Sequence, residues 1–352
     1  MSHAFYERIR DLPVHIEASA RSCRHAETSY GYCRPTTVIE LSGDGHTGIG
    51  EDVTTGRGDQ PRLQREGFEA DLTGTYTIEE FSGFVGTLDP IVATDWNYPG
   101  SARRWALESA ALDLGLRQAG TSLGARLGRS YDPVRFVVSL RLENPVSTAP
   151  IEAWRNIHSD LAFKLDVIPA WDRPFLEELS TVSGIPILDF KARFGDGAGD
   201  DDRVATDPDL YRAVVDAFSD AVFEDPLFEE PYRTVFTGHE RRISWDARIT
   251  GVDSVRSLPF EPSWLNIKPA RFGSLQSLFE TIEYAKDRDI RLYGGGMFEL
   301  DRGRAHLHSL ASLFYPDGPN DIAPAGYNEP EPHSDVAASP LSPPAAPQGL
   351  GF

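Results

Sequence analysis

The sequence has little cysteine and no long apolar run. Its two cysteines, Cys23 and Cys33, are too few for a disulfide framework and lack the spacing of a zinc site. This usage is typical of a reducing compartment, so we expect a cytoplasmic location. The amino-terminal residues contain no apolar stretch of the length found in signal peptides, and no run of about 18 apolar residues occurs. Membrane insertion and secretion by a signal peptide are therefore disfavoured.

Positive charge is also scarce. The 352 residues include 54 acidic and 34 basic side chains, which gives a formal net charge of -20. A chain with this charge repels phosphate backbones, so nucleic acid is not expected as a partner. The hydrophobic content of 40% and the charged content of 25% are those of an ordinary globular protein. A chain that handles small anions must then gather positive charge locally, from basic side chains or a metal ion.

Short apolar segments recur from residue 136 onward. They are 136–142, 161–167, 185–190, 221–224, 243–246, 264–268 and 290–293, with helical patterns between most of them. Strands that alternate with helices in this way form βαβ units with a parallel sheet, and seven such units predict an α/β protein with a closed TIM-type (β/α) barrel. An open, doubly wound sheet is the competing architecture.

The first hundred residues have a different character. Segments 35–41 and 47–53 are predicted strands on either side of the turn SGDGH, so we expect a β-hairpin there. A helix is expected from Ser101 to about Gln118.

These patterns predict two domains. An α+β capping domain covers residues 1–98 and is completed by the tail 327–352, and the barrel covers 99–326. The last 24 residues include six prolines, so we expect an extended tail that wraps the body or is partly loose.

Ionisable residues end almost every apolar segment of the barrel. Because the chemistry of such barrels lies at the carboxyl ends of the strands, these are the candidate site residues: Lys164, Asp166, Asp189, Lys191, Glu224, Asp246 and Lys268. Three carboxylates from successive strands, Asp189, Glu224 and Asp246, suit Mg²⁺, which prefers oxygen ligands. The competing interpretation is that such residues only cap the barrel and pair with one another. A joint cluster of buried acids and lysines favours a site, because burying charge is costly.

The motifs around these residues resemble the enolase superfamily, nearest its muconate-lactonizing-enzyme and mandelate-racemase-like branch. They are FKLDV with Lys164, ILDFK with Asp189, VFEDP with Glu224, ISWDA with Asp246, LNIKPAR with Lys268, and GGGMFELDRGR at 294–304. The helix at 101–128 and the hairpin TTVIELSGDGHTGIGED resemble the same family, so the likeness covers most of the chain.

This resemblance implies a lyase or isomerase that removes a proton α to a carboxylate through a metal-stabilised enediolate. The outcome is dehydration, epimerisation or cycloisomerisation. Mg²⁺ would lie on Asp189, Glu224 and Asp246, and Lys268 would act on one face of the substrate. A homo-oligomer is also expected from the family, and the alternative is an enolase-like barrel that serves as a ligand-binding protein without catalysis.

The base on the second strand departs from the family pattern. The family has a lysine pair there and uses its second member, whereas this chain has Asp166 at that position and Lys191 where the family has an asparagine on the third strand. We hypothesise that Lys191 or Asp166 replaces the base, with Lys191 favoured because a lysine near a cation can have a lowered pKa. The competing interpretation is an ion pair between the two that only neutralises the site.

Three further residues are candidates for substrate binding. By resemblance to the specificity loop of the family, Arg34 or Arg24 suits a substrate carboxylate, and Glu299 follows the seventh segment at the edge of the site. The expected substrate is a small-molecule carboxylate.

Overall fold

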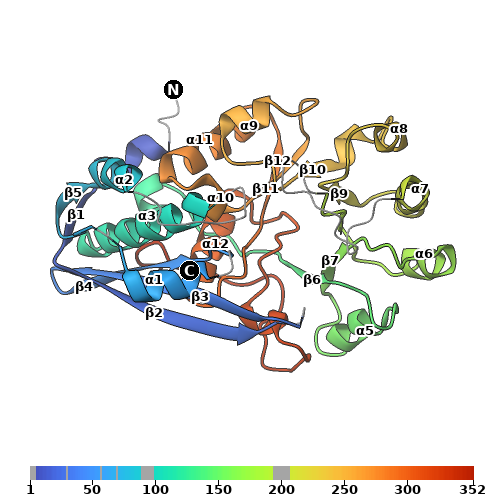
Figure 1. The fold of residues 1–352 in the computed structure, drawn as a ribbon, viewed down its shortest axis with the longest axis horizontal. Coiled ribbons are helices and arrows are strands. Elements are labelled where there is room, and N and C mark those ends of the chain that lie inside the picture. Colours follow the sequence, from blue (N-terminus) through green and yellow to red (C-terminus); the bar gives the residue numbers. More distant parts are fainter. Residues whose placement is uncertain (1–4, 29–30, 56–57, 69, 89–98, 193–206) are drawn as a thin grey trace.

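The structure is a computed structural model that describes residues 5–28, 31–55, 58–68, 70–88, 99–192 and 207–352. Figure 1 shows a curled parallel sheet on one side and an antiparallel sheet covered by a long helix on the other. This is the predicted combination of a barrel and an α+β cap.

Seven parallel strands form the barrel, in the order of the sequence. They are β6 (Val137–Leu140), β7 (Ala162–Asp166), β8 (Ile187–Asp189), β9 (Val222–Glu224), β10 (Ile243–Trp245), β11 (Trp264–Ile267) and β12 (Arg291–Gly294). Six fall within a predicted apolar segment and β12 extends one residue beyond its segment, so the seven predicted strands are confirmed. Leu165, Leu188 and Phe223 are fully buried and share the face of the sheet that the helices cover. They alternate along the strands with Asp166, Asp189 and Glu224, which face the opposite way.

The helices that follow the strands range in length from 4 to 13 residues. They are α5 (Ala149–Arg155), α6 (Arg173–Ser180), α7 (Pro208–Ala217), α8 (Tyr232–Val235), α9 (Val252–Arg256), α10 (Pro269–Phe272), α11 (Leu275–Lys286) and α12 (Arg302–Phe314), with single turns at Tyr6–Arg8, Glu240–Arg242 and Ala325–Asn328. Most are visible around the strands in Figure 1.

Two residues close the barrel between its first and last strands. The Val137 backbone N–H donates to the Asn320 carbonyl at 2.9 Å, and the Asp321 N–H donates to the Gly294 carbonyl at 2.8 Å. Parallel bridges at the same place make Asn320 and Asp321 a short eighth strand position. The sheet therefore closes, and the open doubly wound alternative is wrong.

The cap consists of two small antiparallel sheets and two helices, and the long helix α3 packs against it. Its elements are β1 (Pro13–Ile16), paired with β5 (Gly74–Thr77); β2 (Ala18–Glu27), β3 (Cys33–Gly43) and β4 (His46–Asp52); and α1 (Asp59–Glu66) and α2 (Ile78–Thr87), with α3 covering Pro99–Gln118. The hairpin of β3 and β4 confirms the predicted one. Helix α3 lies so close to β4 that a Cβ at Gly50 would be 1.9 Å from the Ala106 carbonyl oxygen, so only glycine fits there.

The carboxyl-terminal tail packs on the body. Leu341 pairs with Val134 through two backbone hydrogen bonds of 2.8 and 2.9 Å. Gly349 bridges Ser122, just before α4 (Leu123–Leu127), and Leu350 is fully buried. In the part of the chain that the structure describes, no helix combines the length and apolar character needed to cross a bilayer.

Candidate functional site

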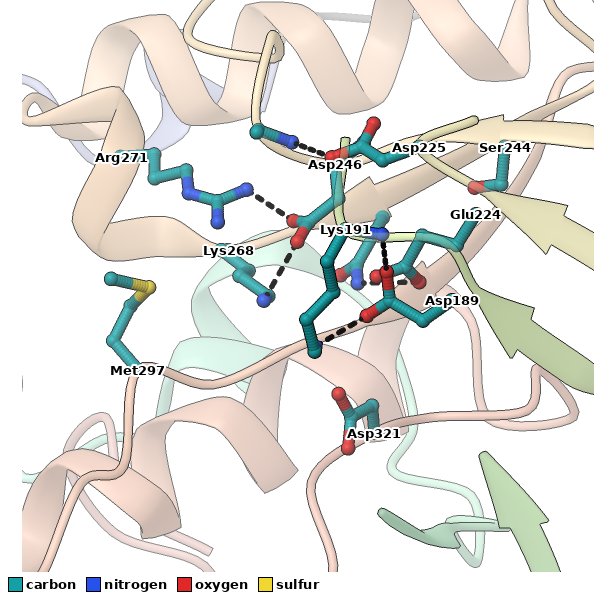
Figure 2. A network of polar contacts seen from close by, with 12 residues as sticks. Asp189, Lys191, Glu224, Asp225, Ser244, Asp246, Lys268, Arg271, Met297 and Asp321 are labelled. Carbon is teal, nitrogen blue, oxygen red and sulfur yellow. Dashed lines mark hydrogen bonds and ion pairs between the residues drawn. The ribbon is translucent and has the colours of Figure 1, made fainter. Parts of the chain in front are cut away.

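The three predicted metal ligands lie together at the carboxyl ends of adjacent strands. Asp189 ends β8 and lies in register with Glu224, which ends β9, and Asp246 directly follows β10. All three are buried, with at most 6% of the residue surface exposed. Figure 2 shows Asp189 directed at Lys191, and Asp246 directed at Lys268 and Arg271. Because parallel strands end at the same rim, residues far apart in the sequence meet here.

Lys164 is the central cation of this group. Its Nζ lies 3.0 Å from Asp189 Oδ2 and 3.1 Å from Asp321 Oδ2, and it donates a third, short hydrogen bond to Glu224 Oε1. Burial alone lowers the pKa of Lys164, but the carboxylates of Asp189, Asp321 and Glu224 outweigh this effect and hold the pKa well above its usual value. Lys164 is therefore a fixed cation with three carboxylate partners.

Lys191 and Asp166 face each other across adjacent strands. Lys191 Nζ lies 3.0 Å from Asp166 Oδ1 and 2.7 Å from Asp189 Oδ2, and its backbone is in the left-handed region with φ +51°. The Asp166 carboxylate is buried and also lies 3.7 Å from Arg141, and burial raises the pKa of Asp166. The lysine side chain, in contrast, is 42% exposed. The exchange of residues between the two strands thus leaves an ammonium group that solvent can reach.

Lys268 and Arg271 hold the third ligand. Lys268 Nζ donates to Asp246 Oδ2 at 2.8 Å, and Arg271 donates a short bond to the other oxygen. Burial raises the pKa of Asp246, but Arg271 and Lys268 outweigh this and lower the pKa to about 2. Asp246 therefore stays ionised.

A second layer of polar groups orients the ligands. Asn266 Nδ2 donates to Glu224 Oε2 at 3.2 Å, and the Tyr293 hydroxyl donates to the same oxygen. Asp225 accepts the backbone N–H of Asp246 at 2.9 Å. Burial raises the pKa of Glu224 to about 8, an effect that Lys164 opposes, and burial together with the neighbouring Asp246 raises the pKa of Asp225 to about 7.

The donor chemistry at this rim fits a divalent cation. Three carboxylates supply the oxygens that Mg²⁺ prefers. Among the described residues six carboxylates face five cations, namely Asp166, Asp189, Glu224, Asp225, Asp246 and Asp321 against Arg141, Lys164, Lys191, Lys268 and Arg271, so one negative charge is in excess when all are ionised. In this arrangement, however, each oxygen of the three ligands already accepts from a donor of the chain. A metal ion must therefore displace some of these donors.

The ligand atoms are also not yet gathered as tightly as a metal ion needs. Among the described residues, one group of acidic, histidine or cysteine side chains has ligand atoms that all lie within 4.8 Å of one another. It consists of His15, Glu17 and Asp44 and lies on the cap. In the barrel, Asp189 and Glu224 lie around the Lys164 ammonium, whereas Asp246 is held by Lys268 and Arg271.

The three substrate-binding candidates are engaged in contacts within the chain. Arg34 Nη2 donates to the Met297 carbonyl at 2.9 Å and to the Val53 carbonyl, and so ties the cap to the loop after β12. The Glu299 carboxylate accepts the Met297 backbone N–H at 3.0 Å. Their assignment to a substrate stays a prediction. Arg24 pairs with Asp301 at 2.7 Å and also joins the cap to the barrel.

Sequence reasoning missed several members of the site. Arg271 lies inside the motif LNIKPAR, and Asp225 directly follows Glu224. Both could therefore be predicted from the sequence as residues at the strand ends. Asp321 could not, because its strand position is only two residues long and gives no apolar pattern. Asn266 and Tyr293 alternate with core residues on their strands, which is the signal of an inward-facing polar group.

Comparison with known proteins identifies the family. The family described as a domain of unknown function, DUF8230, matches the chain with its N-terminal domain over residues 7–126 and its C-terminal domain over 130–329. The boundary between 1–98 and 99–326 proposed from the sequence stays a prediction.

Named relatives and a solved structure are similar to this chain. The chain is 25% identical to an N-succinylamino acid racemase of Thermus thermophilus over 90% of this chain and 84% of the relative, and 25% identical to an o-succinylbenzoate synthase of Listeria innocua over 65% and 60%. The structure of a dipeptide epimerase from Methylococcus capsulatus, in complex with a Mg ion, has a TM-score of 0.66 at 18% identity and covers 96% of this chain and 99% of that one.

These findings confirm the predicted fold and the resemblance to the enolase superfamily, and they confirm the prediction of an enzyme. They leave the substrate and the roles of individual residues open. The chain belongs to the DUF8230 family, and its fold is that of solved members of the enolase superfamily.

Proposed function

We propose that the protein is a Mg²⁺-dependent lyase or isomerase that removes a proton α to the carboxylate of a small molecule. Asp189, Glu224 and Asp246 would hold the metal ion. When bound, Mg²⁺ supplies positive charge to the substrate carboxylate and so makes the α-proton more acidic. A homo-oligomer in the cytoplasm remains part of this proposal.

One observation carries the proposal: three of the four lysines in the chain meet at this rim. Lys164, Lys191 and Lys268 all contact the proposed ligands, and only Lys286 lies elsewhere. The other 30 basic residues are arginines. Lysine, unlike arginine, can change its protonation state in a protein, so its concentration at one site favours proton transfer over simple charge neutralisation.

The lysines can take different roles because their surroundings differ. Lys164 has three carboxylate partners and stays protonated, so it stabilises negative charge. Lys191, from the strand end at β8, and Lys268, from β11, contact different ligands, Asp189 and Asp246. We assign proton transfer to these two groups, one for each face of the substrate.

Lys191 is the better candidate for the relocated base. Its side chain is 42% exposed, whereas that of Asp166 is 1% exposed, so substrate can reach the amine more easily than the carboxylate. Asp166 then orients Lys191. The same ion pair is expected if Lys191 only neutralises Asp166. A measurement of α-proton exchange must therefore distinguish a base from a counter-charge.

The test is exchange of the α-proton in D₂O with Mg²⁺ present, followed by NMR. N-Succinylamino acids and dipeptides are the first candidate substrates, because two similar proteins are named as an N-succinylamino acid racemase and a dipeptide epimerase. We expect exchange in the wild type and a loss of at least about 100-fold in Lys191→Ala and Lys268→Ala, each for one enantiomer. Lys286→Ala is the matched control and should exchange normally.

Two results would contradict this assignment. Full exchange in Lys191→Ala would show that Lys191 only neutralises Asp166. Tight binding of a carboxylic acid without exchange of any α-proton would favour the ligand-binding alternative over the enzyme.

A further inference from the structure

Asp321 stands at the point where the barrel closes, and its side chain turns into the site. Its backbone N–H completes the sheet against Gly294, and its Oδ2 lies 3.1 Å from Lys164 Nζ. Figure 2 shows Asp321 apart from the three ligands. Its side chain is 16% exposed, compared with 3% for Asp189 and 0% for Glu224.

Lys164 occupies the space that a cation between Asp189 and Glu224 would use. Its Nζ contacts both carboxylates. A divalent ion on the same oxygens would lie within a few ångströms of the ammonium, and at that separation the repulsion is strong in a buried site. The ammonium must therefore move away from two of its three partners while it keeps a counter-charge.

We propose that Asp321 is a positioning residue, which retains the Lys164 ammonium when Asp189 and Glu224 bind Mg²⁺. This inference rests on the proposed metal site. Asp321 is suited to the role because it already accepts from Lys164, and because it lies outside the ligand triad. The flexible lysine stem allows the ammonium to shift toward Asp321 without leaving the site.

Calorimetric titration of the EDTA-treated protein with MgCl₂ tests this role. Asp321→Asn keeps the size of the side chain and the backbone closure but removes the counter-charge, and we expect it to weaken Mg²⁺ binding about 10- to 100-fold. Asp317→Asn is the matched control, since its side chain is 91% exposed and lies 3.8 Å from Arg135. The control should bind as the wild type does.

A second pair of variants separates positioning from the loss of one negative charge. Lys164→Met removes the competing ammonium, so we expect it to bind Mg²⁺ at least about tenfold more tightly than the wild type. In that background Asp321→Asn should change the affinity less than about threefold, because there is no ammonium left to hold. This pair stays informative even if the single Asp321→Asn variant does not fold.

The outcomes are distinct. Unchanged affinity in folded Asp321→Asn, equal weakening in both backgrounds, or no gain in Lys164→Met would each overturn the inference while leaving the proposed function intact. Absence of Mg²⁺ binding in the wild type and in Lys164→Met would instead overturn the metal site of the proposed function, and this inference with it.

Discussion

The ammonium of Lys191 lies 3.0 Å from a carboxylate oxygen of Asp166, across the gap between two adjacent parallel strands. Asp166 and Asp189 are direct neighbours in the register of these strands. Lys191 therefore separates two buried carboxylates that would otherwise repel each other. The pairing gives the exchange of residue types between the second and third strands a structural reason.

Removing this ammonium should destabilise the protein. We expect Lys191→Met to lower the free energy of unfolding by about 1–2 kcal/mol at neutral pH, less than for a fully buried pair because the lysine is partly exposed to solvent. Asp166→Asn in the same chain should restore most of the loss. Urea unfolding in EDTA measures both, with Lys286→Met as a surface control. Equal stability of Lys191→Met and the wild type would show that the pair contributes nothing.

The metal-free protein should lose stability as the pH rises from 6 to 8. Burial raises the pKa of Glu224 to about 8 and that of Asp225 to about 7, so the folded state holds protons that the unfolded state has released. Stability from such groups is complete below their unfolded pKa and is lost as the pH passes through the folded pKa. We expect a loss of about 3–4 kcal/mol over these two pH units.

Two variants test whether Glu224 and Asp225 cause this pH dependence of stability. Glu224→Gln and Asp225→Asn remove one titrating group each, so each should flatten the dependence of the unfolding free energy on pH. Urea unfolding in EDTA at several pH values measures it. A wild-type stability that rises between pH 6 and 8, or variants with the wild-type slope, would contradict the raised pKa values.

A side chain at Gly295 would collide with Asn266 and Lys268 of the site. A Cβ there would be 2.3 Å from Asn266 Oδ1 and 2.5 Å from Lys268 Cε. We therefore expect Gly295→Ala to cost about 1–3 kcal/mol and to reduce α-proton exchange, because Lys268 must move. Gly83→Ala is the control: its Cβ would meet nothing within 4 Å inside α2, so it should be neutral or stabilise by up to about 1 kcal/mol. A Gly295→Ala protein with normal exchange would show that Lys268 tolerates the shift.

Glu51 joins the cap to the barrel. Its carboxylate accepts the backbone N–H groups of Leu300 at 2.6 Å, Asp301 at 2.9 Å and Gly303 at 3.1 Å, at the start of α12. Glu51→Ala leaves these donors without their partner, so we expect a loss of about 2–4 kcal/mol by thermal or urea unfolding. The exposed Glu177→Ala on α6 should stay within about 0.5 kcal/mol of the wild type. A Glu51→Ala chain as stable as this control would contradict the clamp.

The sequence by itself determined the seven strands and the rim on which the charged residues gather. Apolar segments of four to seven residues between helical patterns specify strands of a parallel sheet, and the residue that ends each segment must then lie at the same rim. This is why Asp189, Glu224, Asp246 and Lys268 could be placed together without a structure.

Only the tertiary structure decided which charges touch. Asp321 enters the site through a two-residue strand position with no pattern of its own, and Lys164 lies among three carboxylates from three different segments. Arg34 donates to the carbonyls of Val53 and Met297, and Glu299 accepts the Met297 N–H in the loop after β12. Such partners depend on side-chain directions and on barrel closure, which long-range packing fixes and local sequence patterns do not encode.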